Sequence, residues 1–411
     1  MEVAVRPGTP ADAVLGVQPS RVFRPSSLEE AEETLRECAK ERLRLVFVGG
    51  GTELDLGAPP AGLDAVLNTQ GLTKVLEYAP LDQIVTAESG VSLGTLQALL
   101  KEKRQMLALD PPWAERATLG GIVATNAFGP RRTRYGSVRD LIIGVTLIRA
   151  DGTRAKGGGK VVKNVAGFDL PKLMVGSLGS LGLIATVTFR LHPLPEASST
   201  VVFPRIPAAA VGRLMAELRK GQFEPSAVAA LWSEAGLDLG CRFEGFDAGV
   251  RKQRDHLVAL ARTLDVPNEV LDGTAADGFW SRQTSVREAP ANVRAKLATL
   301  PTDMVGAAAE VWPILRDVLQ MPRAVFYPTA GLAFVAGNMR DPEALAHAVV
   351  RGRELLAPRG GHLVLHSAPM ELRARTNVWG PAPSGAPLFA RVKDALDPEH
   401  RLAAGRTVGG L

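Results

Sequence analysis

The alternation of apolar and polar residues predicts short strands and amphipathic helices in the first half of the chain. The run LRLVFVG at 43–49 predicts a buried strand, and residues 65–68 predict a second one. Ser27 begins an S-x-x-E capping box, which predicts a helix to about Arg42. Residues 83–103 predict a strand, a turn and a helix, and residues 141–154 alternate toward an Asp-Gly turn that is typical of a hairpin.

The pattern changes after Pro195, where strands begin to alternate with amphipathic helices. Residues 201–206 and 227–232 predict strands, and each is followed by a helical segment. This order favours an α+β domain with an antiparallel sheet at 199–358. We therefore expect a first domain at 1–198, and a strand and helix within 359–411 that return to it.

Composition excludes several classes of protein. The chain has 411 residues, a net charge of +5 and two cysteines that are far apart. No basic tract alternates with aromatic residues, so no nucleic-acid partner is expected, and the cysteine spacing fits no metal or cluster site. No apolar run reaches the ~18 residues of a membrane span. We expect a cytoplasmic protein that contacts a membrane only through a partner.

Three glycine-rich segments are the strongest chemical signal. They are VFVGGGTELDLG at 46–57, TLGGIVATN at 118–126 and GSLGSLGLI at 176–184. Glycine lets backbone N–H groups approach an anion closely, so the series predicts a phosphate-bearing cofactor. A Rossmann fingerprint fails because Leu54 takes the third glycine position, and a Walker loop fails because Val161 follows Gly159-Lys160.

The order of these segments resembles the PCMH-type FAD-binding domain of the vanillyl-alcohol oxidase superfamily. That family has GGGT, TLGG-x-x-ATN and GSLGTLGII motifs, and the likeness covers about residues 15–195. The resemblance implies a two-lobed FAD-binding domain followed by an α+β cap domain. Within the superfamily, GPRRTRYGSVRD, the segment at 157–182 and the tail motif at 397–406 are most similar to the FAD-binding E subunits of bacterial glycolate oxidases.

The resemblance implies roles for twelve residues around FAD. The first loop would offer N–H groups to the pyrophosphate, the second would line phosphate and ribityl, and the third would face the isoalloxazine and adenine. A Cβ at Gly50 is expected to block the pyrophosphate. The residues are Gly49, Gly50, Gly51, Thr52, Thr118, Gly120, Gly121, Thr125, Gly179, Ser180, Gly182 and Ile184.

Many family members link the flavin to a histidine near the first loop. Here Thr52 follows Gly51, and no histidine precedes His192. The FAD is therefore expected to be non-covalent. The tail reads Ala403-Ala404-Gly405-Arg406 instead of the usual Asn-Pro-Gly-Arg, which leaves its contact with the flavin domain open.

Oxidising a 2-hydroxy acid requires a base and a cation for the carboxylate. Weak base candidates are His362 and His366, which share one face of a predicted strand. Arg134 is the leading cation among several, and for each of them a structural ion pair is the favoured alternative, because such pairs are common at surfaces. The other cations are Arg131, Arg132, Arg139, Lys160 and Lys163.

The family resemblance also implies partners. The histidine-flanked GDGN segment of related catalytic subunits is missing, which favours an accessory flavin subunit. It would act with a second, catalytic FAD subunit and an iron–sulfur subunit on glycolate or D-lactate. The alternatives are a non-catalytic scaffold with a flavin fold and a stand-alone FAD-dependent alcohol or sugar oxidase.

Overall fold

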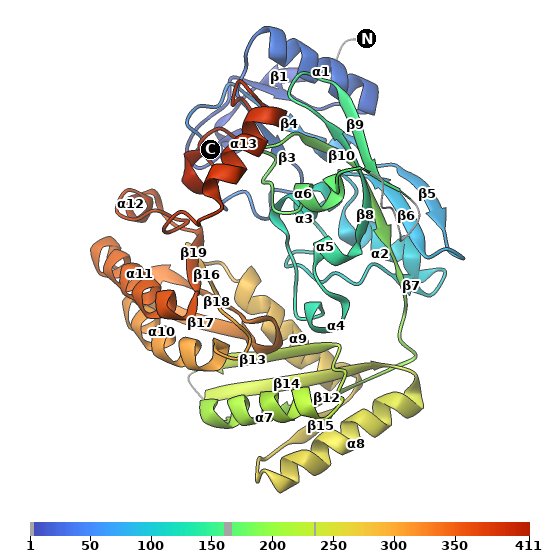
Figure 1. Ribbon diagram of the computed structural model, residues 1–411, viewed down its shortest axis with the longest axis vertical. Coiled ribbons are helices and arrows are strands. Elements are labelled where there is room, and N and C mark those ends of the chain that lie inside the picture. The colour runs from blue at the N-terminus through green and yellow to red at the C-terminus, as the bar shows by residue number, and fades with distance from the viewer. Residues whose placement is uncertain (1–3, 160–166, 234–235) are drawn as a thin grey trace. The chain divides into compact units, whose positions relative to one another are not determined.

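The computed structural model describes residues 4–159, 167–233 and 236–411 (Figure 1). The described chain divides into two compact units. The first contains residues 1–128, 136–193 and 381–411, and the second contains residues 129–135 and 194–380. Both units combine helices with sheets, so the predicted α+β class with two domains is confirmed.

Two main sheets form the first unit. In the four-stranded sheet, β2, β4 and β3 run parallel and β1 is antiparallel at the edge, whereas the five-stranded sheet is antiparallel throughout. The four-stranded order is β1 (Val5–Pro7), β2 (Arg21–Phe23), β4 (Ala65–Asn68), β3 (Leu45–Val48). The five-stranded order is β5 (Val75–Ala79), β6 (Ile84–Glu88), β10 (Leu183–Arg190), β8 (Ile142–Ile148), β9 (Arg154–Gly158). A short pair joins β7 (Gln105–Met106) to β11 (His192–Pro193).

Helices of the first unit begin at capping residues that the sequence supplies. The Ser27 side chain accepts from the N–H of Glu30 at the start of α1, and the Ser92 side chain accepts from Thr95 at the start of α2. Helix α1 buries Leu35 against the same core as Leu45 and Ile148. The helices are α1 (Leu28–Lys40), α2 (Leu93–Lys101), α3 (Leu119–Thr125), α5 (Val138–Leu141), α6 (Leu170–Met174) and α13 (Ala386–Leu396).

The C-terminal segment returns to the first strands of the chain. Figure 1 shows the red helix α13 among blue N-terminal elements. Leu402 forms a parallel bridge with Leu45 of β3 and is completely buried in the same core. The tail is therefore part of the first unit, which answers the question that its altered motif left open.

The second unit is built on an antiparallel sheet of eight strands. Its order is β15 (Glu269–Leu271), β12 (Ala197–Phe203), β14 (Gly236–Gly245), β13 (Ala227–Ser233), β17 (Leu319–Tyr327), β18 (Leu332–Met339), β16 (Val293–Ala298), β19 (His362–Ser367). The longer helices expose charged residues and bury apolar ones against the sheet or each other. The helices are α4 (Arg132–Tyr135), α7 (Ala208–Lys220), α8 (Asp247–Thr263), α9 (Gly273–Glu288), α10 (Met304–Val318), α11 (Pro342–Leu356) and α12 (Met370–Arg373).

The observed division differs from the expected boundaries in two places. Strand β19 was expected to return to the first domain, but it pairs with β16 inside the second unit, so the return begins at Pro381. Residues 129–135 also belong to the second unit, because Arg131 and Arg134 bond to Glu244 there.

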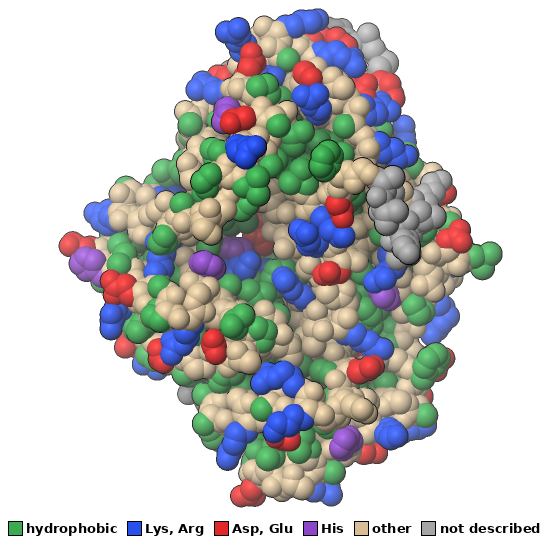
Figure 2. All heavy atoms as spheres, viewed as in Figure 1, with side chains coloured by type: hydrophobic (Ala, Val, Ile, Leu, Met, Phe, Trp, Pro, Cys, Tyr) green, Lys and Arg blue, Asp and Glu red, His purple; other side chains and the backbone are tan. Residues whose placement is uncertain are grey.

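Two surface properties bear on possible partners. None of the described helices is long and apolar enough to cross a membrane. Figure 2 shows Lys and Arg side chains interspersed with Asp and Glu over the visible face.

Candidate functional site: a glycine-lined cavity

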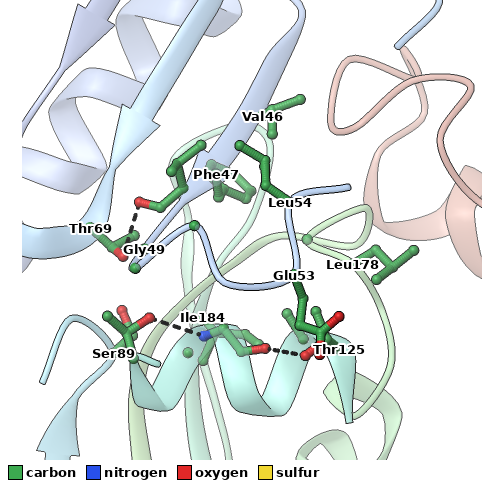
Figure 3. Close-up of a pocket in the computed structure, with 18 of the residues that line it drawn as sticks. Val46, Phe47, Gly49, Glu53, Leu54, Thr69, Ser89, Thr125, Leu178 and Ile184 are labelled. Carbon is green, nitrogen blue, oxygen red and sulfur yellow. Dashed lines mark hydrogen bonds between the residues drawn. The ribbon is translucent and has the colours of Figure 1, made fainter. Parts of the chain in front are cut away.

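The first unit contains an open cavity where the three glycine segments meet. Its empty space, counted together with the mouth that opens to solvent, is about 780 Å³. Eleven of the twelve predicted residues line it, all except Ser180. In Figure 3 the loop that carries Gly49 and Glu53 lies on one side of the cavity and helix α3 on the other.

The first glycine loop begins where β3 ends at Val48. Gly51 has a φ of +69°, a conformation in which an L side chain is strained. Within the described chain, the N–H groups of Gly50, Gly51 and Thr52 have no hydrogen-bond partner in the protein. Successive unbonded N–H groups in a loop of this kind suit the oxygen atoms of an anion.

The second glycine segment is a helix, not the loop that the sequence predicted. Thr118 caps α3 by accepting from the N–H of Gly121, and the N–H of Gly120 donates to the Ser89 carbonyl at 2.8 Å. A Cβ at Gly120 would lie 2.7 Å from the Ser89 Cβ, so glycine lets the helix pack against that residue. The amides of Gly120 and Gly121 are thus bonded within the protein.

The third segment folds back against the first. Its N–H at Leu178 donates to Ala124 at 2.8 Å, and a Cβ at Gly179 would come within 3.0 Å of the Phe47 ring on β3. Ser180 is the one predicted residue outside the cavity lining, because its buried hydroxyl turns back to donate to the Ser177 carbonyl at 2.7 Å.

Ser89 is a cavity residue that the sequence did not indicate. Its side chain lies at the end of β6, is 1% exposed, and its Oγ has no hydrogen-bond partner in the protein. A buried hydroxyl is normally bonded, so this one fits a polar group supplied by a ligand. Together with the free N–H groups of the first loop, it shows that the cavity suits a polar, phosphate-bearing cofactor.

We expect Ser89→Ala to weaken FAD binding without lowering the stability of the apoprotein. A net hydrogen bond contributes about 0.5–1.5 kcal/mol, so the Kd for FAD should rise about threefold to tenfold. Thr186→Val is the matched control. Thr186 is also buried, but its hydroxyl donates to Thr146 at 2.7 Å outside the cavity. The Thr186→Val variant should be less stable than the wild type and should keep its FAD affinity. If Ser89→Ala instead lowered stability and left FAD affinity unchanged, Ser89 would be excluded from the site.

Neither cysteine lies in the cavity lining. Burial raises the pKa of both the Cys38 and Cys241 thiols to about 12, which suppresses their reactive thiolate forms. Among the described cavity residues none is histidine, cysteine or tyrosine. The non-covalent attachment of the flavin stays a prediction.

None of the described catalytic candidates is among the residues that line this cavity. The Arg134 guanidinium donates to the Glu244 carbonyl at 2.6 Å, and Arg131 pairs with the Glu244 carboxylate at 2.9 Å. Arg132 belongs to α4 beside them, Arg139 is exposed on α5, and Lys160 and Lys163 lie outside the described residues. Within the described chain, no group of three potential ligands is placed to hold a metal ion.

A second group of cations surrounds Phe334 in the second unit. The Arg287 guanidinium lies 4.0 Å from the ring centroid of Phe334, and Lys296 is the direct cross-strand neighbour of that residue. His366 packs edge-on against the same ring at 6.1 Å, whereas His362 is exposed at the start of β19. Sequence reasoning missed Arg287 and Lys296, although the alternation in VRAKLA indicates a strand that could have placed Lys296 on one face.

The family model described as FAD binding domain matches residues 19–158, a stretch that contains the first two glycine segments. Residues 19–158 thus carry an FAD binding domain. The predicted cofactor, FAD, and the resemblance to FAD-binding flavoproteins are therefore confirmed.

Several curated proteins share sequence with this flavoprotein chain. It is 34% identical to glycolate oxidase subunit GlcE of Escherichia coli over 226 residues, which are 55% of this chain and 63% of that one. It is 35% identical to a D-lactate dehydrogenase of Archaeoglobus fulgidus, covering 44% of this chain and 41% of the relative. The chain thus matches less than two thirds of the length of these relatives.

Solved structures show the same fold at low sequence identity. A p-cresol methylhydroxylase with bound substrate matches this flavoprotein with a TM-score of 0.74 at 16% identity, covering 94% of this chain and 88% of the other. An alkyldihydroxyacetonephosphate synthase matches with a TM-score of 0.70 at 16% identity, covering 95% and 77%. These likenesses concern the fold alone.

Proposed function

We propose that this chain is the FAD-carrying subunit of an assembly that oxidises a small 2-hydroxy acid of the glycolate or D-lactate type. Its partners would be a second, catalytic FAD subunit and an iron–sulfur subunit that receives electrons. The observation that carries the proposal is the glycine-lined cavity with its unbonded N–H groups and the orphaned Ser89 hydroxyl. The likeness to glycolate oxidase subunits and D-lactate dehydrogenases supports the substrate class.

The residues of the cavity would hold the cofactor rather than carry out proton transfer. Gly50, Gly51 and Thr52 would donate their N–H groups to the pyrophosphate, while Leu178 and Ile184 would exclude water with apolar surface. When bound, FAD accepts a hydride or electrons. No imidazole lines the described cavity, so a separate catalytic subunit would supply the base.

A second candidate function is turnover of the 2-hydroxy acid by this chain itself. It is favoured by the group around Phe334, where Arg287 and Lys296 could bind a carboxylate and His366 could accept a proton. Arg287 is 8% exposed, and its guanidinium has the geometry to donate to both oxygen atoms of a carboxylate.

Anaerobic reduction of the FAD-loaded chain distinguishes the two. We expect glycolate or D-lactate to leave the flavin absorbance of the isolated chain unchanged, while dithionite bleaches it. When the two partner subunits are added, the same hydroxy acid should reduce the flavin. Bleaching of the isolated chain by the acid would contradict the accessory role. If Arg287→Met abolished that bleaching but kept FAD, turnover at the Phe334 group would be supported.

A further inference from the structure

Helix α13 buries only one residue within the described structure, and that residue is a lysine. Lys393 is 2% exposed, and all three protons of its ammonium group have acceptors. The Nζ donates to the Ser180 carbonyl at 2.8 Å, to the Leu402 carbonyl at 2.7 Å and to the Asp397 carboxylate at 2.5 Å. Asp397 is itself fully buried and also accepts from the N–H of Leu402 at 2.8 Å.

The acceptors of this ammonium group belong to elements that build the cavity. Ser180 lies between Gly179 and Gly182, both of which line the cavity. Leu402 forms a β-bridge with Leu45. The N–H of Leu45 donates to the Arg401 carbonyl at 2.7 Å, and the N–H of Ala403 donates to the Leu45 carbonyl at 2.7 Å. Leu45 opens strand β3, which leads directly into the first glycine loop.

The end of the tail bonds to the first loop as well. The Arg406 side chain is 4% exposed and donates to the carbonyls of Leu54 and Leu56, both at 2.7 Å. Residues 393–406 therefore connect the third glycine segment, through Ser180, with the first, through Leu45, Leu54 and Leu56. The two segments are more than a hundred residues apart in the sequence.

We propose that Lys393 is a positioning residue for FAD, which holds the Gly179–Gly182 turn and the first glycine loop in register through its bonds to Ser180, Leu402 and Asp397. Lys393 itself does not touch the cavity. It acts through the backbone of the turn, where FAD would meet Gly179 and Gly182.

Stability alone does not account for a buried pair at this point. Burial lowers the pKa of Lys393, and the adjacent Asp397 carboxylate opposes that effect. Desolvating two charges costs so much that apolar residues of similar volume often replace such a pair without loss of stability. An ion pair does, however, fix the geometry of the groups bonded to it, and a cofactor site depends on such geometry.

The double variant Lys393→Met with Asp397→Leu tests this proposal by removing both charges while keeping volume. We expect a folded apoprotein with an unfolding midpoint near that of the wild type. Its Kd for FAD should rise about tenfold or more, which is within the usual range of coupling free energies between two connected sites. The reduction potential and visible circular dichroism of the remaining bound flavin should also shift. Wild-type FAD affinity and flavin spectra in this variant would overturn the proposal.

The pair Arg359–Glu310, at 2.6 Å in the second unit, provides the control. Arg359→Met with Glu310→Leu should leave FAD affinity and spectra unchanged. If the Lys393→Met, Asp397→Leu variant fails to fold, hydrogen exchange of the wild-type protein tests the proposal instead. FAD binding should slow exchange at the amides of Leu402 and Ala403, because coupling between two sites is reciprocal. Equal exchange with and without FAD would overturn the proposal. These readouts involve no hydroxy acid, so they stand apart from the proposed oxidation.

Discussion

Gly50→Ala is expected to give a folded chain that has largely lost its FAD. A Cβ at this position would overlap the Arg116 carbonyl oxygen and lie 2.8 Å from the carbonyl carbon. Backbone cannot rotate away as a side chain can, so the first loop would shift. Overpacking of this kind costs about 1–3 kcal/mol, which corresponds to a roughly fivefold to hundredfold loss of affinity if the cost falls on the bound state.

The physical reason differs from the one that the sequence suggested. A Cβ at Gly50 was expected to meet the pyrophosphate itself, but the structure directs it at Arg116. The effect on FAD is therefore indirect, through displacement of the N–H groups of Gly50 to Thr52. Gly212→Ala is the control, since a Cβ there has nothing within 4 Å. Equilibrium titration with FAD measures both, and wild-type affinity in Gly50→Ala would contradict the loop geometry.

Glu244→Ala is expected to destabilise the second unit by about 3–5 kcal/mol, the usual cost of removing one partner from a buried ionic group. The Glu244 side chain is 4% exposed, and its carboxylate lies 2.9 Å from Arg131 and 3.7 Å from Arg242. Removing it leaves two guanidinium groups that are largely desolvated. Urea unfolding, monitored by hydrogen exchange at the β14 amides, measures this loss of stability. Glu310→Ala at the exposed pair with Arg359 should leave the midpoint unchanged.

The same group gives the second unit a pH dependence. Burial raises the pKa of Glu244, but Arg242 and Arg131 outweigh it, so the pKa lies below its ordinary value. A carboxylate with a lowered folded pKa stabilises the fold above its unfolded pKa of ~4.3. That stabilisation is lost as the pH falls through the folded value. Glu244→Gln should therefore show a smaller loss of stability on acidification than the wild type, and an equal loss would contradict this assignment.

Much of the cavity could be predicted because its glycines occur in an ordered series of motifs. A glycine in a series of ordered motifs carries a backbone requirement, such as the positive φ of Gly51 or the close packing of Gly179 on Phe47. Ser89 could not be found in this way, because a single serine at the end of a strand has no pattern. Its place in the cavity arises from tertiary packing, which brings it against Gly120, a distant residue in the sequence, and leaves its hydroxyl unbonded.

The prediction from local helix propensity was wrong at one helix and missed two others. Gly120 and Gly121 suggested a loop, yet Thr118 caps a helix there, and packing against Ser89 stabilises it. Helices α9 and α10 were not predicted because the first contains Gly278 and lacks a clear apolar stripe, while the second contains Pro313. Tertiary packing outweighed propensity at each of these segments.

The flavin content of the purified full chain tests the central claim most directly. The chain is incubated with FAD, freed of excess, and denatured with acid, and flavin is then measured in the supernatant and in the precipitated protein. A non-covalent site in the glycine-lined cavity predicts one FAD per chain, all of it in the supernatant, and a much lower content for Gly50→Ala than for Gly212→Ala. Flavin that remains with the precipitate, or wild-type chain that retains none after incubation, would contradict the account.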